Sequence, residues 1–71
     1  MEAIRDIDHH MLCTADPDSG TLEHKSRGET ITIHLLPGCD VAFRKKESYT
    51  VIRRESPSSL NVYSTHLTAP D

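Results

Sequence analysis

The segment from Glu29 to Phe43 constrains the fold of this chain more than any other part. Apolar and polar residues alternate along it, which is the period-2 pattern of a β-strand with one buried face. The alternating apolar residues are Ile31, Ile33 and Leu35 and, after an interruption at Pro37-Gly38, Val41 and Phe43. The pattern predicts a β-hairpin that turns near Pro37-Gly38.

Strand register limits how this predicted hairpin can turn. A loop made of Pro37 and Gly38 alone would place Asp40 and Arg44 on the face that carries Ile33. Proline also cannot adopt the positive φ that the tight two-residue hairpin turns require. We therefore expect an odd-length loop or a bulge, with Ile33 in the core and facing Val41 or Phe43.

Turn-forming residues recur along the rest of the chain at intervals of roughly 8–12 residues, a spacing typical of antiparallel meanders. The predicted fold is mainly β, a small antiparallel meander of about five or six strands that forms a curved sheet or a small barrel. Strands are expected near His9–Thr14, Thr21–Ser26, Glu29–Leu36, Cys39–Arg44, Ser48–Arg54 and Leu60–His66. The strand Ser48–Arg54 has apolar residues at both parities, which predicts that both of its faces are covered, either at the centre of the fold or at a subunit contact.

The N-terminal segment fits two interpretations. Ile4, Ile7 and Met11 lie at helical spacing, which would give a short helix before Asp16. The turn-forming sequence Asp-Pro-Asp-Ser-Gly at positions 16–20 instead favours a strand over residues 9–14 that pairs with the next one. We favour the strand, preceded by a short helical or irregular stretch, and expect residues 1–8 and 68–71 to fray.

Size and composition predict a single domain, residues 1–71, with a small core. Only 35% of the 71 residues are hydrophobic and 4% are aromatic. A domain this small often needs a disulfide, a metal or self-association to be stable. Since burying a face against a second copy is the simplest of these, we expect a homodimer.

The chain has an acidic end and a mildly basic body. Residues 1–24 carry six acidic residues against one arginine, whereas residues 25–71 carry seven basic residues against five acidic ones. Neither segment has the charge density that would demand a nucleic acid partner.

Cysteine usage and hydropathy predict a cytoplasmic protein. Two cysteines, Cys13 and Cys39, are too few for a disulfide scaffold, so free thiols are expected and a Cys13–Cys39 bridge is the alternative. The first residues lack the basic start and apolar run of a signal peptide. No stretch has the length of a membrane span, so no membrane association is expected.

The nearest approach to a metal motif is the group His9, His10 and Cys13. Either His34 or Cys39 would have to complete a zinc site, but zinc ligands usually come as two tight pairs and the second pair is missing. We expect no metal and no other cofactor.

A basic hairpin offers one candidate function, the binding of single-stranded nucleic acid by a small barrel. It consists of Arg44, Lys45, Lys46, Arg53 and Arg54. The aromatic residues Phe43, Tyr49 and Tyr63 would supply stacking surfaces. A simpler interpretation is a solvated hairpin whose lysines discourage aggregation at a sheet edge.

The other candidate function is protein binding. The chain has no nucleophile elbow, phosphate loop or other catalytic motif, so we expect no enzyme activity. By elimination, the chain is interpreted as a small regulator or inhibitor that docks on a partner protein, of the kind that phages and mobile elements encode. The predicted docking surface is either a sheet edge or the exposed face of Tyr49, Ile52 and Tyr63.

Overall fold

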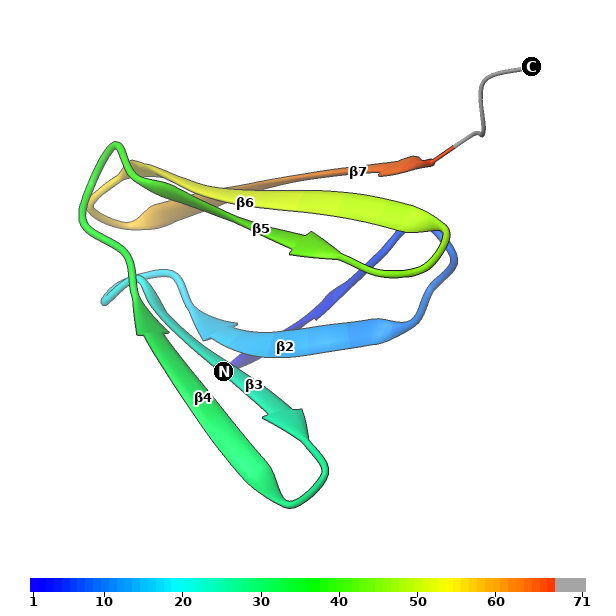
Figure 1. The fold of residues 1–71 in the computed structure, drawn as a ribbon. Helices are drawn as coiled ribbons and strands as arrows, with labels where there is room; N and C mark the ends of the chain where they lie inside the picture. Colours follow the sequence, from blue (N-terminus) through cyan, green and yellow to red (C-terminus); the bar gives the residue numbers. More distant parts are fainter. Residues whose placement is uncertain (68–71) are drawn as a thin grey trace.

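The protein forms seven antiparallel strands in two meander sheets that do not close into a barrel (Figure 1). This computed structural model describes residues 1–67, and it has no helix in that range. One sheet has the order β1-β2-β3-β4 and the other the order β5-β6-β7. The strands are β1 Glu2–Arg5, β2 Met11–Asp16, β3 Thr21–Ser26, β4 Glu29–His34, β5 Asp40–Arg44, β6 Ser48–Ser56 and β7 Ser59–His66. The predicted antiparallel meander is confirmed.

Local turn chemistry explains the two hairpins that join β2, β3 and β4. The β2–β3 turn ends at Gly20, whose N–H donates to the Asp16 carbonyl at 2.8 Å and whose φ is +71°. The β3–β4 turn consists of Arg27 and Gly28, with φ of 51° and 79°. Two successive positive φ angles match a tight hairpin turn whose twist suits the flanking strands.

The N-terminal segment begins with a strand, so the alternative of a short helix is wrong, and the irregular stretch expected before β2 is limited to the loop at residues 6–10. β1 pairs with β2, with Ile4 opposite Cys13 and Arg5 opposite Met11. Leu12 is the extra residue between these pairs, as in a β-bulge, and both Leu12 and Cys13 are buried. Pairing of this kind holds residues 2–5 in the sheet instead of leaving them frayed. The expectation for residues 68–71 falls outside the described residues.

The predicted hairpin between residues 29 and 44 is wrong. β4 pairs with β3 and β5 pairs with β6, and residues 35–39, here called the crossover, carry the chain from one sheet to the other. Alternation shows that two strands each bury one face, but it does not show that they pair with each other. Ile33, Val41 and Phe43 do pack against one core, from opposite sheets.

The core lies between the two sheets and is built from small and aliphatic side chains. Its fully buried members include Leu22, Ile52, Thr50 and Cys13. In β6 the residues at even positions face this core, because Ser48, Thr50, Ile52 and Arg54 are all buried. Tyr49, at an odd position of β6, is exposed, so one copy of the chain does not cover both faces of this strand, and cover by a subunit contact stays a prediction.

A buried arginine closes one end of the sandwich. The Arg54 guanidinium donates to three carbonyl oxygens, those of Leu35 at 2.8 Å, Pro57 at 2.8 Å and Asp18 at 3.1 Å. These carbonyls belong to the crossover and to the β6–β7 and β2–β3 turns. A Cβ on Gly20 would lie 2.5 Å from the Leu35 carbonyl oxygen and 2.8 Å from Arg54 Cδ. Glycine at position 20 therefore makes room for this arginine.

Candidate functional site

The outer face of the β5-β6-β7 sheet carries exposed aromatic side chains. Tyr49 and Tyr63 are 36% and 66% exposed. Val51 pairs with Tyr63 on one side and with Ala42 on the other, and Tyr49 is the next residue of β6 on the same face. We call this surface the tyrosine face; its residues are Ala42, Tyr49, Val51 and Tyr63.

The third predicted docking residue does not share this face. Ile52 is fully buried and pairs with Val41 and Val62 on the core side of the sheet. Since side chains alternate between the two faces of a strand, Ile52 and its neighbour Val51 cannot both contact a partner on the outer side. Val51, and not Ile52, lies on the outer face with Tyr49 and Tyr63.

The structure does not bring the five residues of the predicted basic hairpin together. Arg54 is buried in the core, and Arg53 lies 3.4 Å from Asp40 and 3.2 Å from Glu55 in ion pairs. Lys45 and Lys46 remain exposed at the β5–β6 turn, and Arg44, the last residue of β5, is exposed opposite Tyr49. The described residues therefore form no continuous basic strip along both strands. Arg54 points into the interior, and Arg53 is neutralised by neighbouring carboxylates.

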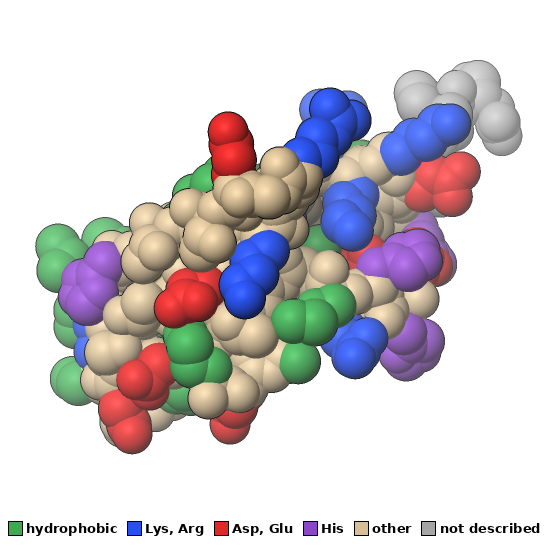
Figure 2. All heavy atoms as spheres, turned by 90° about the horizontal axis from the view of Figure 1, so that it is seen from below, with side chains coloured by type: hydrophobic (Ala, Val, Ile, Leu, Met, Phe, Trp, Pro, Cys, Tyr) green, Lys and Arg blue, Asp and Glu red, His purple; other side chains and the backbone are tan. Residues whose placement is uncertain are grey.

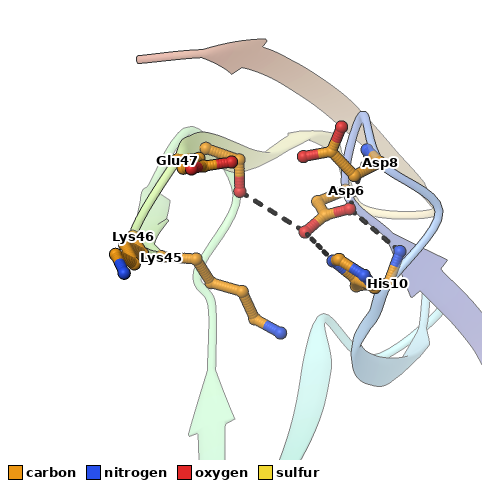
Figure 3. A pocket seen from close by; sticks show the side chains of 7 residues that line it. Asp6, Asp8, His10, Lys45, Lys46 and Glu47 are labelled. Carbon is orange, nitrogen blue, oxygen red and sulfur yellow. Dashed lines mark hydrogen bonds and ion pairs between the residues drawn. The ribbon is translucent and has the colours of Figure 1, made fainter. Parts of the chain in front are cut away.

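A polar hollow of about 410 Å³ lies beside that turn. The lining residues are Asp6, Asp8, His10, Lys45, Lys46, Glu47 and Ser48. The Lys45 side chain extends toward the hollow, opposite Asp6 and His10 (Figure 3). Residues 6–10 form the loop between β1 and β2, so the hollow lies where this loop meets the other sheet.

Asp6 organises this loop from a buried position. One carboxylate oxygen, Oδ1, accepts from the backbone N–H groups of Asp8 and His10, both at 2.9 Å. The other, Oδ2, accepts from the Ser48 hydroxyl at 3.3 Å and lies 3.6 Å from His10 Nδ1. Burial alone would raise the pKa of Asp6, but the hydrogen bonds from His10 and Asp8, the His10 imidazole and Ser48 together hold it below its usual value.

A second polar contact joins the same loop to the end of β7. His66 Nε2 lies 2.6 Å from Asp8 Oδ1, and the Ile7 N–H donates to the Ser64 hydroxyl at 2.9 Å. The hydrogen bond to Asp8 and its negative charge raise the pKa of His66; desolvation opposes this effect, and Glu47 and Asp6 add to it. The loop is thus fastened to both β6 and β7.

The residues considered as zinc ligands are not gathered into one site. Cys13 is buried in the core, where burial raises the pKa of its thiol, and Cys39 is exposed in the crossover. Both cysteines are free thiols. Within residues 1–67, the group whose potential ligand atoms lie within 4.8 Å of one another is Asp6, Asp8 and His10. Because Asp6 already accepts three hydrogen bonds, this group is explained by the architecture of the loop.

Sequence reasoning missed two of these features. A signal for the inward orientation of Arg54 was present, since Arg54 has the same parity as Thr50 and Ile52. The role of Asp6 had no comparable signal, because its partner Ser48 is 42 residues away along the chain.

Charge is dispersed on the face of the molecule seen in Figure 2. Acidic and basic side chains are interspersed there, and hydrophobic side chains lie in small groups between them. Within the described range, no helix is long and apolar enough to cross a membrane.

Comparison of the chain with protein-family models, curated proteins and solved structures gives no match.

Proposed function

We propose that this protein is a small regulator or inhibitor that docks on a partner protein through the tyrosine face. The observation that carries the proposal is the exposure of Tyr49 and Tyr63 on one side of an antiparallel sheet whose other side forms the core. Tyrosine is enriched among the residues that dominate binding energy at protein interfaces, because it buries a large apolar area and keeps a polar group for hydrogen bonding.

The surroundings of the tyrosine face also support docking on a protein. Arg53, Asp40 and Glu55 form an ion-pair network next to Val51 along the sheet. An apolar centre with a charged rim is the usual arrangement of a protein interface. The polar hollow fits a small-molecule pocket poorly, because charged side chains line it, whereas most such pockets are apolar.

The alternative function, nucleic-acid binding, has less support. Within residues 1–67, Arg44, Lys45 and Lys46 are the predicted basic residues that are exposed and form no ion pair like those of Arg53. Three positive charges at one turn give weak, salt-sensitive attraction to a phosphate backbone.

Affinity capture from a lysate of the source cells tests the proposal. A double Tyr49→Ser, Tyr63→Ser variant should lose the captured protein, since both substitutions remove exposed aromatic area without touching the core. Met11→Ser is the matched control, because Met11 is 51% exposed on the other sheet and its loss should leave capture unchanged. Capture that disappears on nuclease treatment, or that the tyrosine variant retains in full, would contradict the proposal.

A further inference from the structure

Strand β4 is an edge strand of its sheet, and some of its backbone N–H and C=O groups point away from the neighbouring strand β3. The tight turn at Arg27-Gly28 makes Ser26 and Glu29 a hydrogen-bonded pair, so alternate residues of β4 point their N–H and C=O groups at β3. The bond from Leu35 N–H to the Gly20 carbonyl, at 2.8 Å, continues the same alternation. The N–H and C=O groups of Thr30, Thr32 and His34 therefore point away from β3.

The other sheet edges carry features that discourage pairing with another chain. β1 is four residues long and interrupted by a bulge. β5 begins and ends with charged residues, Asp40 and Arg44. The C-terminal part of β7 is fastened to the β1–β2 loop through Ser64 and His66. β4 is a regular strand of six residues with no proline, lysine or bulge, and its one carboxylate, Glu29, lies at its start, so it has less of the usual protection of an edge.

An apolar row along β4 is covered only at one end. Leu35, at the crossover, is 5% exposed; Ile33 is half-buried; and Ile31, closer to the hairpin tip, is 50% exposed. In Figure 1 the β3–β4 hairpin diverges from the β5-β6-β7 sheet toward its tip, so the second sheet does not reach Ile31.

We propose that β4 pairs with β4 of a second copy of this chain, antiparallel about a two-fold axis at Thr32. Outward-facing residues must lie opposite outward-facing residues, which allows only registers that pair even-numbered positions with each other. With Thr32 opposite its own copy, Thr30 lies opposite His34 of the second copy. Ile31 then lies opposite Ile33 of the second copy, in the pairs where side chains approach most closely.

Neighbouring registers fit less well. Moving the axis to Ile31 places Ile33 opposite Glu29 of the second copy, which sets a carboxylate against an apolar side chain. Moving it to Ile33 places Ile31 opposite Leu35, which lies beyond the end of β4 and whose side chain is already buried in the core. The axis at Thr32 pairs both isoleucines and forms one continuous eight-stranded sheet from two four-stranded ones.

Charge also suits a second copy as the occupant. Glu29 is the one carboxylate of β4, and six residues of strand separate it from its own copy, a distance of about 20 Å. At that separation the mutual repulsion is largely screened at physiological salt. The tyrosine face belongs to the other sheet and stays free, so this inference does not depend on the proposed function.

Disulfide trapping tests both the partner and the register. In a Cys39→Ser background, which removes the exposed thiol, Thr32→Cys should cross-link to a covalent dimer under mild oxidation, because residues in a hydrogen-bonded pair have Cα atoms about 5.5 Å apart. Thr30→Cys is the matched control. It should cross-link at least tenfold more slowly, because position 30 lies opposite position 34 of the second copy, four residues from position 30 of that copy. Equal rates, or preferential trapping through Ile31→Cys, would overturn the proposal.

Sedimentation equilibrium at micromolar concentration gives an independent test. Wild type and Thr32→Ala should be dimers, whereas Thr32→Pro should be a monomer with unchanged strand content, because the N–H that proline removes makes no bond to β3. Ile31→Lys supplies a second disrupting variant if the proline variant does not fold. A monomeric wild type would mean that the edge is solvated or reserved for a different partner, and it would refute the dimer. A wild-type dimer unaffected by either disrupting variant would do so as well.

Discussion

At the scale of single residues, Arg53 and Arg54 show how strand parity decides a role. Both are arginines in β6, yet Arg53 forms ion pairs at the surface and Arg54 donates to three backbone carbonyls in the interior. Within residues 1–67, the Nε of Arg54 has no hydrogen-bond partner. The three carbonyls come from segments far apart in sequence, so Arg54 connects both sheets at one end of the sandwich.

Replacing these two arginines by alanine should therefore have very different effects on stability. Arg54→Ala leaves buried carbonyls without donors and should lower the free energy of unfolding by about 3 kcal/mol. Arg53→Ala removes exposed ion pairs and should cost less than about 1 kcal/mol. Urea unfolding of both variants measures the difference, and similar midpoints would show that the Arg54 contacts contribute little.

At the scale of elements, sequence patterns predicted which segments are strands better than they predicted which strands pair. The predicted strand Thr21–Ser26 agrees with β3, and the others overlap β2 and β4–β7. The error between β4 and β5 arose because Ile33 and Val41 face one core from opposite sheets, and alternation is the same in a hairpin and in a sandwich. The docking residues Tyr49 and Tyr63 were predicted together with Ile52, which is buried, because the pattern of β6 did not decide which face is outward. Asp6 depends on a distant partner that no local pattern encodes.

The β1–β2 loop should make stability depend on pH in two directions. The pKa of Asp6 is lowered on folding, so its contribution is present above the unfolded value of about 3.9 and is lost as the pH falls through the folded value. The pKa of His66 is raised, mainly by its hydrogen bond to Asp8, so its contribution is complete below about pH 6.5 and is lost as the pH rises through the folded value.

Thermal unfolding between pH 3 and pH 9 checks this account. We expect the Tm of the wild type to be highest between these two transitions, near pH 5–6. His66→Gln should remove much of the decline on the alkaline side, and Asp6→Asn much of the decline on the acid side. Profiles of the variants that run parallel to that of the wild type would show that other groups dominate.

The same loop leads us to expect that a chelator leaves stability unchanged. Asp6 is committed to hydrogen bonds with the loop and with Ser48, and Cys13 lies in the core. Unfolding with and without a chelator, together with elemental analysis of protein purified without added metal, measures this. One stoichiometric metal whose removal lowers the Tm would contradict the expectation.

In the whole molecule, the two proposed binding surfaces lie on different sheets. The β5-β6-β7 sheet presents the tyrosine face, and the β1-β2-β3-β4 sheet presents the open edge of β4. Since these surfaces belong to different sheets, a dimer through β4 would display two tyrosine faces. The small aliphatic core and the 4% aromatic content lead us to expect that self-association stabilises this chain.

We expect the tyrosine face, and not the basic turn, to bind the partner. Titration of the captured partner tests this with wild type, the Tyr49→Ser, Tyr63→Ser variant and a charge-reversed variant in which Lys45 and Lys46 are changed to Glu. Arg44 is left unchanged because it lies opposite Tyr49. The tyrosine variant should lose at least tenfold in affinity. The charge-reversed variant should keep binding with slower, salt-sensitive association, because rim charges act mainly on the association rate. A larger loss of affinity in the charge-reversed variant than in the tyrosine variant would show that the basic turn binds the partner. Submicromolar binding of the wild type to a short oligonucleotide at physiological salt, abolished by the charge reversal, would favour nucleic-acid binding instead.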